Sequence, residues 1–346
     1  MSDTLKELLK KLTEDQMLSR ADMENCFVEI IKGEATEVQI SAFITALKMK
    51  GETAEDIAAG SSVLRRLAVT IPGRDDAIDI VGTGGDGIGT WNISTAATFV
   101  VAGAGVPVAK HGNTAVSSKS GASDVLAALG INLKANVTTV QKALDEAGVC
   151  FLMAPLYHSG MRHVGPIRKE LAFRSIFNIL GPISNPALVK RTMIGVYDKV
   201  LLKPFAEALD RLGATNALIV HGRDGLDEVT TTTATDAVLL KDGKITEMEL
   251  NPSDIGIEVA KTEDLIGGTP EENAAALTAL LEGKKNAYRD IVVMNAAAAL
   301  YGSGHAADLK EGAERAVASI DSGAAKRALE GLVEITNAEE DDEEIA

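Results

Sequence analysis

Apolar residues recur with helical spacing over the first 70 residues of the chain. Leu5, Leu8, Leu9 and Leu12 fall three or four residues apart, as on the buried face of an amphipathic helix. Residues that commonly cap helices precede the later apolar stretches, namely Ser19, Thr36 and Thr53. The pattern predicts four helices, around residues 5–12, 21–32, 37–49 and 53–67. We therefore expect a small helical domain over residues 1–70.

Beyond the turn-forming linker Pro72–Asp76, short apolar runs alternate with helical patterns. This alternation predicts a large α/β domain over residues 75–335 with a mainly parallel sheet. The predicted strands are 78–81, 106–109, 149–153, 192–196, 217–220, 238–240 and 244–250. The last two flank Lys241-Asp242-Gly243, which predicts a hairpin at a sheet edge. Helices are predicted from Asn92 onward and over 123–129, 271–281, 289–301 and 310–320.

One segment of the α/β region, about residues 160–186, departs from this alternation. It is rich in Arg, Lys and His and ends at Gly181-Pro182. From the residues alone, it predicts a basic amphipathic helix with a solvated charged face.

Charge and composition narrow the classes of function. The 346 residues carry a formal net charge of −16, which argues against a general nucleic-acid surface. Six of these charges lie in Glu339–Glu344, within an acidic tail (338–346) that we expect to be disordered. In so acidic a chain, a phosphate-rich ligand must be held by backbone amides, a few placed cations and a divalent metal.

The chain shows no sign of a membrane or secretory protein. It contains no apolar run of about 18 residues, and its first residues lack the basic and apolar build of a signal peptide. Cys26 and Cys150 lie far apart, without metal-type spacing. We therefore expect a cytoplasmic protein with reduced thiols.

Glycines dominate the sequence after the first predicted strand. Five occur between Gly82 and Gly89, followed by Asn92, Ser94 and Thr95 at the start of a helix. A strand, a glycine turn and a helix N-terminus make a common phosphate site, because backbone N–H groups can approach the anion. The sequence lacks the Gly-Lys-Ser/Thr of a Walker loop, and a simple capped turn remains an alternative.

Two further polar motifs follow predicted strands. The run Lys110-His111-Gly112-Asn113 and the segment Ser117–Gly121 add two lysines near the glycine turn. Asp227 and Glu228 follow the strand 217–220, at the sheet edge where open α/β sheets bind ligands. Adjacent carboxylates suit Mg²⁺, although the same two residues are also compatible with a solvated surface loop.

Three motifs together, GTGGDGIGTWNIST, KHGN and SSKSGASDVLAALG, resemble those of the anthranilate phosphoribosyltransferase family. The resemblance covers about residues 1–335. It implies a nucleoside phosphorylase-like fold, in which the 160–186 segment packs on the small helical domain and two chains associate through that domain. It also implies transfer of the phosphoribosyl group of phosphoribosyl pyrophosphate to anthranilate, with Mg²⁺ and without a dedicated general acid or base.

The resemblance also implies roles for individual residues. Phosphoribosyl pyrophosphate would be bound by Gly82, Gly85, Asp86, Thr90, Asn92, Ile93, Ser94, Thr95, Lys110, Ser118, Lys119 and Ala122. Anthranilate would be bound by Gly82, Asn113 and Arg168, with His111 and His158 lining its path. Metal ions would be bound by Ser94, Asp227 and Glu228.

The chain departs from the family pattern near the acceptor. Thr114 stands where an Arg usually follows KHGN, Ala122 replaces a serine, and His-Pro-Ala-Met becomes His158-Ser159-Gly160-Met161. Two alternatives therefore stay open. One is a pyrimidine nucleoside phosphorylase, which the acidic pair and KHGN disfavour. The other is a non-catalytic nucleic-acid-binding relative, which the negative charge disfavours.

Overall fold

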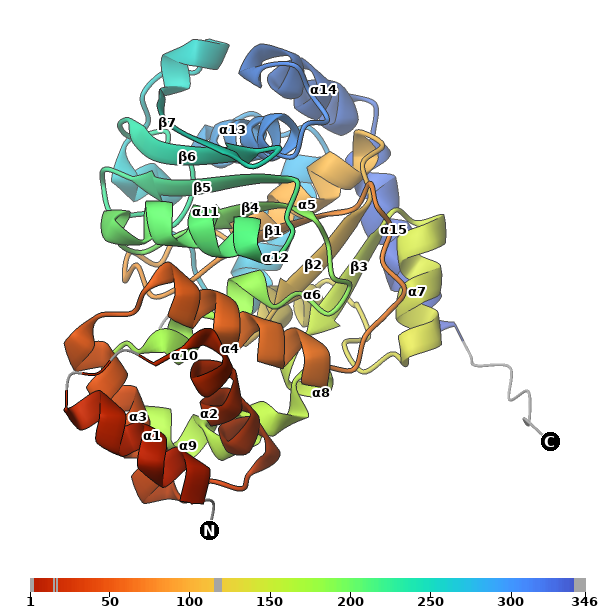
Figure 1. Ribbon diagram of the computed structural model, residues 1–346. Helices are drawn as coiled ribbons and strands as arrows, with labels where there is room; N and C mark the ends of the chain where they lie inside the picture. Colours follow the sequence, from red (N-terminus) through yellow and green to blue (C-terminus); the bar gives the residue numbers. More distant parts are fainter. Residues whose placement is uncertain (1–2, 15, 17, 115–119, 339–346) are drawn as a thin grey trace.

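A computed structural model describes residues 3–14, 16, 18–114 and 120–338 of the chain. A small group of helices lies beside a larger α/β unit built on one twisted sheet (Figure 1). This arrangement confirms the predicted fold class.

The four N-terminal helices form where the sequence predicts them. Their bounds are α1 Asp3–Thr13, α2 Arg20–Lys32, α3 Glu37–Lys50 and α4 Ala54–Leu67. The side chains of Ser19, Thr36 and Thr53 each accept a hydrogen bond from the backbone N–H three residues later. Each is half of a capping box, which stabilises a helix start by about 1 kcal/mol.

The basic segment is not one helix, so that prediction was wrong. From α8 (Ala154–Tyr157) onward the chain runs in short pieces, and the segment itself contains η1 Ser159–His163, α9 Gly165–Leu171, α10 Ile176–Ile179 and η2 Gly181–Ile183. Ala172 adopts a left-handed conformation (φ 53°) and Ser175 is extended. These two residues end α9 and turn the chain before α10.

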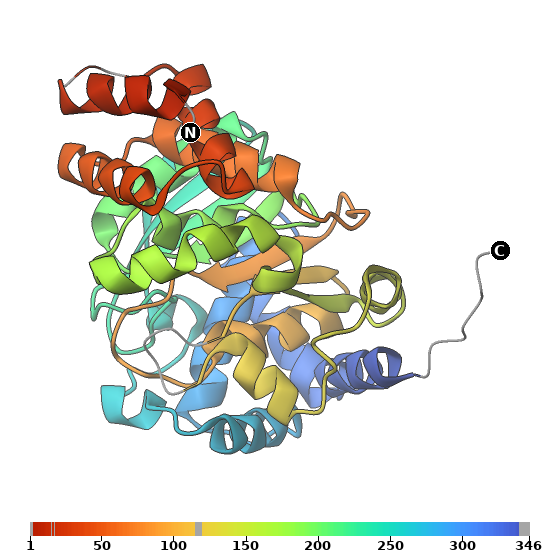
Figure 2. The ribbon, with the colours of Figure 1, turned by 90° about the horizontal axis from the view of Figure 1, so that it is seen from below.

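This broken segment completes the core of the helical unit. The ring of Phe177 packs edge-on against Phe27, with centroids 5.7 Å apart. Gly60 lets α4 approach Leu180, since an added Cβ would lie 2.8 Å from that side chain. Figure 2 shows the yellow-green segment beside the red N-terminal helices. Residues more than 100 positions apart thus share one hydrophobic core.

Within the described residues the sheet has seven strands in the order β3-β2-β1-β4-β5-β6-β7. The strands are β1 Ile78–Gly82, β2 Val108–Gly112, β3 Val149–Met153, β4 Arg191–Gly195, β5 Asn216–Gly222, β6 Thr235–Lys241 and β7 Lys244–Leu250. Strands β1 to β5 pair in parallel, whereas β5–β6 and β6–β7 are antiparallel. The predicted hairpin turn joins β6 and β7.

Helices cover both faces of the sheet. The bounds are α5 Ile93–Gly103, α6 Ala122–Ala128, α7 Val137–Glu146, α11 Leu202–Arg211, α12 Pro270–Leu281, α13 Ala287–Gly302, α14 Leu309–Asp321 and α15 Ala324–Asn337, with short turns η3 Lys199–Leu201, η4 Pro252–Ile255 and η5 Thr262–Leu265. One core contains α5, α7 and α12–α15, whereas α11 shares the other core with the helical unit. Helices α7, α11 and α15 were not predicted.

The chain changes direction across the sheet between β1 and β4. Strands β2 and β3 extend one side of β1, and β4 then starts the other side. The loops that follow β1 and β4 therefore run in opposite directions from the carboxyl ends of these two strands. Such a switch point is where open α/β sheets bind ligands.

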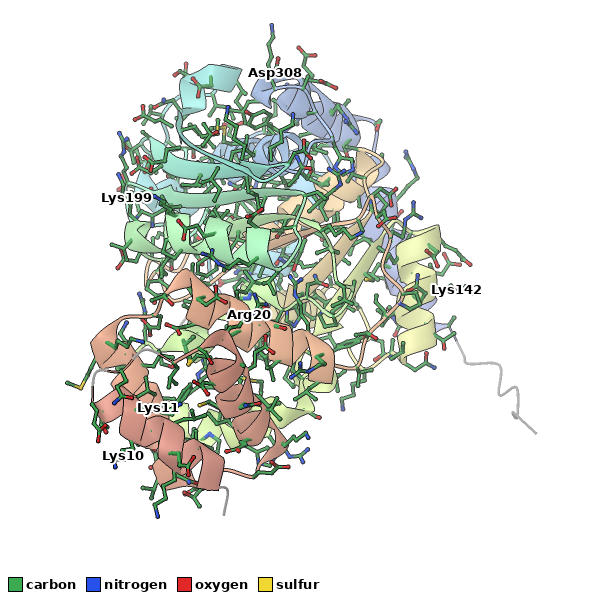
Figure 3. All side chains as sticks on the ribbon, in the orientation of Figure 1. Lys10, Lys11, Arg20, Lys142, Lys199 and Asp308 are labelled. Carbon is green, nitrogen blue, oxygen red and sulfur yellow. The ribbon has the colours of Figure 1, made fainter. Side chains whose placement is uncertain are left out.

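Charged side chains cover the outside of both units (Figure 3). Lys11 pairs with Asp22 at 3.4 Å, and Lys199 pairs with Asp236 at 2.9 Å. Exposed pairs of this kind contribute about 0–1 kcal/mol each, so the two apolar cores carry most of the stability.

Candidate active site

The glycine loop after β1 has backbone φ angles that residues with a side chain rarely adopt. Gly84, Gly85, Gly87 and Gly89 all have positive φ, between 70° and 79°. Thr83 anchors the loop at its start, because its N–H donates to the carbonyl of Gly195 at 2.9 Å. The glycines are therefore required by conformation, and they leave backbone groups open to a ligand.

At the far end of this loop, the polar residues Asn92, Ser94 and Thr95 differ in burial and in hydrogen-bond partners. Ser94 lies in the first turn of α5, while the neighbouring Ile93 and Thr95 are buried. Asn92 does not cap the helix. Its side chain instead donates to the carbonyl of Ser120 at 3.2 Å and accepts from Asn273 at 2.8 Å. Asn92 thus ties the glycine loop to the segment where Ser120 lies.

Two more predicted loop residues are held by neighbouring backbone. Asp86 accepts from the N–H of Ile88 at 3.2 Å, and Thr90 forms an isolated bridge with Ile266. Ser118 and Lys119 lie outside the described residues.

Asp227 and Glu228 lie against the glycine loop, although they are about 140 residues away in sequence. Each side chain is only 8% exposed. Asp227 Oδ2 accepts from the N–H of Gly84 at 2.6 Å, and Glu228 Oε1 accepts from the N–H of Ser94 at 3.1 Å. The loop between β5 and β6 (residues 223–234), here called the acidic loop, therefore covers the switch point between β1 and β4.

Two glycines make this close approach possible, because they have no Cβ atom. A Cβ on Gly82 would fall within 3.0 Å of the Asp227 carboxylate. A Cβ on Gly195, at the end of β4, would overlap the Asp227 carbonyl. Gly82 is thus needed to admit the acidic loop, whatever it contributes to a ligand.

The electrostatics of this pair favour a cation. Burial raises the pKa of Asp227, and the charge of Asp86 raises it further. Burial also raises the pKa of Glu228, and Asp227 adds to that effect. Carboxylates gathered this way are stabilised in their charged form by a divalent ion.

The residues present fit Mg²⁺, which prefers carboxylate oxygens and keeps several waters or phosphate oxygens. Among the described residues, no three His, Cys, Asp or Glu side chains converge as a complete metal cage. A metal here would therefore take part of its coordination from a ligand.

Lys110 points inward rather than into open space. It is 3% exposed, and its ammonium donates to the carbonyl of Ile80 at 2.6 Å and lies 3.4 Å from Ser94 Oγ. Burial lowers its pKa, while Asp79, Glu228 and Asp227 act in the opposite direction. Lys110 is thus an internal counter-ion beneath the site.

Asp79 and Asn185, which received no role from the sequence, support this charge. Asn185 donates to Asp79 Oδ2 at 2.7 Å and to the carbonyl of Ala109 at 2.7 Å. Asp79 Oδ1 accepts from the N–H of His111 at 3.1 Å. A carboxylate in a buried strand was the one available sequence signal for this network.

The two histidines are brought together. The His111 and His158 rings have centroids 5.1 Å apart and are both buried. Their ring nitrogens contact the carbonyls of Gly181 at 3.1 Å and Ser184 at 3.0 Å. Burial lowers the pKa of both, to about 3 for His111, so both rings are neutral at pH 7.

Arg168 lies on α9 and is half-buried. Its guanidinium has no hydrogen bond or ion pair among the described residues, and burial lowers its pKa. Asn113 is exposed after β2, and Ala122 begins α6. Thr114 is also exposed, with its N–H donating to Asn113 Oδ1 at 2.8 Å.

Arg174 is a contact that sequence reasoning missed. Its guanidinium stacks on Tyr197, 3.9 Å from the ring centroid, and donates to the carbonyl of Gly85. It thereby links the broken helical segment to the glycine loop. The signal available was a basic residue beside that segment's turn.

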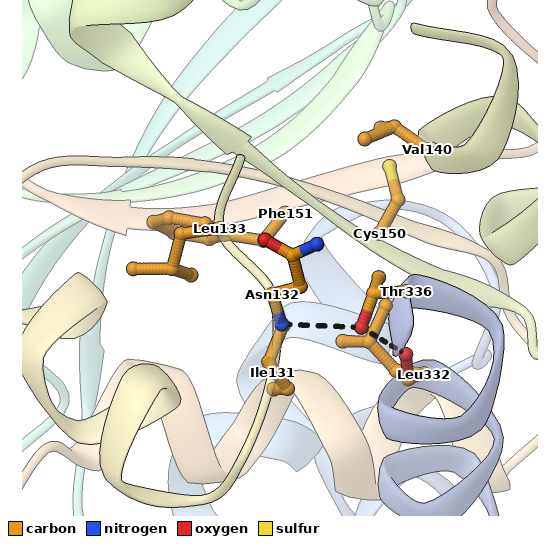
Figure 4. Close-up of a pocket in the computed structure, with 8 residues that line it drawn as sticks. All are labelled: Ile131, Asn132, Leu133, Val140, Cys150, Phe151, Leu332 and Thr336. Carbon is orange, nitrogen blue, oxygen red and sulfur yellow. Dashed lines mark hydrogen bonds between the residues drawn. The ribbon is translucent and has the colours of Figure 1, made fainter. Parts of the chain in front are cut away.

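A separate small cavity of about 10 Å³ lies between β3, α7 and α15, away from these groups (Figure 4). It is lined by Ile131, Asn132, Leu133, Val140, Cys150, Phe151, Leu332 and Thr336. It has room for at most about one water molecule, so it is not a substrate site.

No helix within the described ranges has the length and apolar character needed to cross a membrane.

Comparison with known proteins agrees with this two-part fold. Residues 74–326 match the glycosyl transferase family α/β domain, and residues 6–68 match the helical bundle domain of that family. The chain is 52% identical over 332 residues to anthranilate phosphoribosyltransferase of Parvibaculum lavamentivorans, covering 96% of this chain and 97% of the relative. It is 51% identical to that of Azospirillum brasilense, covering 99% and 96%.

Solved structures agree. The chain superposes on anthranilate phosphoribosyltransferase from Thermus thermophilus with a TM-score of 0.91 and 40% identity, covering 96% of this chain and 99% of the other. For the Saccharomyces cerevisiae enzyme in complex with phosphoribosyl pyrophosphate and Mg, the TM-score is 0.89 at 33% identity, covering 97% and 98%. The chain belongs to the anthranilate phosphoribosyltransferase family.

Proposed function

We propose that this chain transfers the 5-phosphoribosyl group of phosphoribosyl pyrophosphate to the amino nitrogen of anthranilate. The products are N-(5-phosphoribosyl)anthranilate and pyrophosphate, and the step belongs to tryptophan biosynthesis. The observation that carries this proposal is the buried Asp227–Glu228 pair held against the amides of the glycine loop. Family membership supports the same assignment.

The glycine loop and the start of α5 would bind the phosphates of phosphoribosyl pyrophosphate. Backbone N–H groups there, together with Ser94, offer hydrogen bonds to the anion. Lys110 lies beneath them and places a positive charge close to Ser94. Asp227, Glu228 and Ser94 would hold Mg²⁺, which neutralises charge developing on the departing pyrophosphate.

Arg168 would bind the carboxylate of anthranilate. A half-buried guanidinium without a protein partner is a ready site for a planar anion. Asn113 would add a hydrogen bond, and the neutral His111 and His158 would line the approach.

The reaction breaks the bond from the anomeric carbon to pyrophosphate and forms a bond to the amine nitrogen. The aniline nitrogen is neutral at pH 7, so it attacks through its lone pair and, after the bond forms, loses a proton to the departing pyrophosphate. The protein has to position the two substrates, stabilise the leaving group and exclude water.

We also propose that two chains associate through the small helical unit. Val38 and Met49 on α3 are 79% and 85% exposed, which leaves apolar surface uncovered in a single chain. Light scattering at micromolar concentration should give the mass of a dimer, and the mass of a single chain would contradict this proposal.

The direct assay follows anthranilate fluorescence with phosphoribosyl pyrophosphate and Mg²⁺ supplied. We expect the fluorescence of anthranilate to fall over time only when the protein, phosphoribosyl pyrophosphate and Mg²⁺ are all present. An arm with thymidine and phosphate should release no free base. Thymine release with stable anthranilate fluorescence would instead identify a nucleoside phosphorylase.

Exchanging Asp227 for Asn and Glu228 for Gln tests the metal role. The double variant should keep its thermal transition, because the exchange removes buried like charges while conserving size. It should gain no activity as Mg²⁺ is raised. A titration and rate equal to the parent's would rule out metal binding by this pair.

A further inference from the structure

Asn295, in the middle of α13, is a buried polar residue outside the site described above. It is 0% exposed. Its Oδ1 accepts from the N–H of Val229 at 2.9 Å, and its Nδ2 donates to the carbonyl of Val229 at 2.8 Å. A third bond, from Nδ2 to the carbonyl of Ile291 at 2.8 Å, fixes the side chain to its own helix. Asn295 therefore pairs with both backbone groups of the residue that follows Glu228.

The same face of α13 also contacts the glycine loop. Tyr288 lies seven residues before Asn295, two helical turns along the same face. Its hydroxyl donates to the carbonyl of Asn92 at 3.4 Å, and its ring packs on Trp91 with centroids 5.4 Å apart. One helix thus sets the position of both loops that make up the site.

Apart from Asn295, the acidic loop is held at its far end, where the N–H of Thr230 donates to Thr235 Oγ1 at 3.0 Å and the N–H of Ala260 donates to the carbonyl of Thr231 at 2.9 Å. The bonds of Asp227 and Glu228 to the amides of Gly84 and Ser94 use their carboxylate oxygens, the same atoms that would bind a metal. Carboxylates that bound a metal would give up these bonds. Asp224 binds the hydroxyls of Thr230 and Thr232, but these contacts lie within the loop itself. The pairing with Asn295 stays available because it uses only the backbone of Val229.

We propose that Asn295 is a positioning residue that fixes the backbone of Asp227 and Glu228 relative to the glycine loop. It would set the affinity for the metal and the pyrophosphate without touching either. This inference rests on the proposed function, since it assigns Asn295 a task in binding the same substrate.

The test is Asn295→Ala, with Ser319→Ala as its matched control. Ser319 is 3% exposed on α14, and its hydroxyl donates to the carbonyl of Val100 at 2.7 Å, away from both loops. Calorimetry should show phosphoribosyl pyrophosphate binding weakened about ten-fold at fixed Mg²⁺ in Asn295→Ala. Mn²⁺ binding, followed by electron paramagnetic resonance with phosphoribosyl pyrophosphate present, should weaken in parallel.

A merely structural role would lower the melting temperature of both variants and leave these affinities unchanged, which would overturn the proposal. The Michaelis constant for anthranilate should stay within about two-fold of the parent in Asn295→Ala. An equal loss for both substrates would also overturn it.

A measurement on the unaltered protein keeps the proposal testable if Asn295→Ala does not fold. The Val229 amide should exchange with deuterium as slowly in the free protein as core amides of β5 do. Rapid exchange would show that Asn295 does not hold the loop. Absence of any anthranilate consumption by the parent would refute the proposed function, whereas the exchange result would stand by itself.

Discussion

Arg168 and Lys110 show how differently two cations at one site can be used. Arg168 is half-buried and without a partner among the described residues. Lys110 is enclosed, with its charge balanced by Asp79, Glu228 and Asp227. The first is free to recognise a ligand, while the second holds the protein's own groups in place.

Replacing Arg168 with Ala should raise the Michaelis constant for anthranilate by about 10-fold to 100-fold, the equivalent of a lost charge-assisted hydrogen bond. The constant for phosphoribosyl pyrophosphate should change little. Lys169→Ala, at the adjacent and exposed residue of α9, is the control. Arg168→Lys should restore only part of the loss, because an ammonium lacks the planar fork. Equal effects on both substrates would show that Arg168 does not read the carboxylate.

The sequence indicated which residues gather at the site better than it indicated which way they point. The glycine loop and the acidic pair stand out as motifs. The inward direction of Lys110 does not, because both faces of its strand are covered and alternation no longer separates core from surface. Asn295 and Arg174 were missed because their partners lie 66 and 89 residues away.

At the scale of elements, the broken segment packs on α2 through a glycine. A Cβ on Gly160 would fall within 3.0 Å of the Ile31 carbonyl oxygen at the end of α2. This contact gives a physical reason for glycine at position 160.

Gly160→Ala should therefore lower the free energy of unfolding by about 1–3 kcal/mol, as overpacking does. Gly165→Ala is the control, since a Cβ there meets nothing within 4 Å. Urea unfolding of both variants measures the difference. Equal stability of the two would mean that η1 shifts freely away from α2.

Elements with strong local signals were predicted well, and the failures have local causes. Capped helices and apolar strands matched, including β3 and β7 to the residue. Strand β2 was placed two to three residues early, because the apolar run begins at Val106 whereas the pairing begins at Val108. Pro107 lies between them, and the strand continues through the polar Lys110 and His111, which find buried partners. The left-handed Ala172 has no sequence signal.

At the scale of the whole molecule, burial of His111 links stability to pH. Its pKa is about 3 in the folded protein, against about 6.5 for an exposed histidine. The unfolded chain thus takes up a proton that the folded chain refuses. The contribution of His111 is fully present above pH 6.5 and is lost as the pH falls toward 3.

His111→Asn should flatten this dependence. Between pH 7.5 and pH 5, the parent should lose about 2 kcal/mol more stability than the variant. Urea unfolding at a series of pH values gives the difference, in which titrating groups remote from His111 cancel. Parallel curves for the two proteins would show that His111 is protonated in the folded state.

The shared core of α1–α4 and the broken segment also bears on how the chain is made. Leu67 ends α4, whereas Ile183 ends η2, 183 − 67 = 116 residues later. At about 5–20 residues per second, a ribosome needs roughly 6–23 s to cover that distance. Throughout this interval the newly made helices present apolar faces with their partners, among them Phe177 and Leu180, still to be synthesised. We therefore expect these first helices to be prone to aggregation until the middle of the chain has emerged.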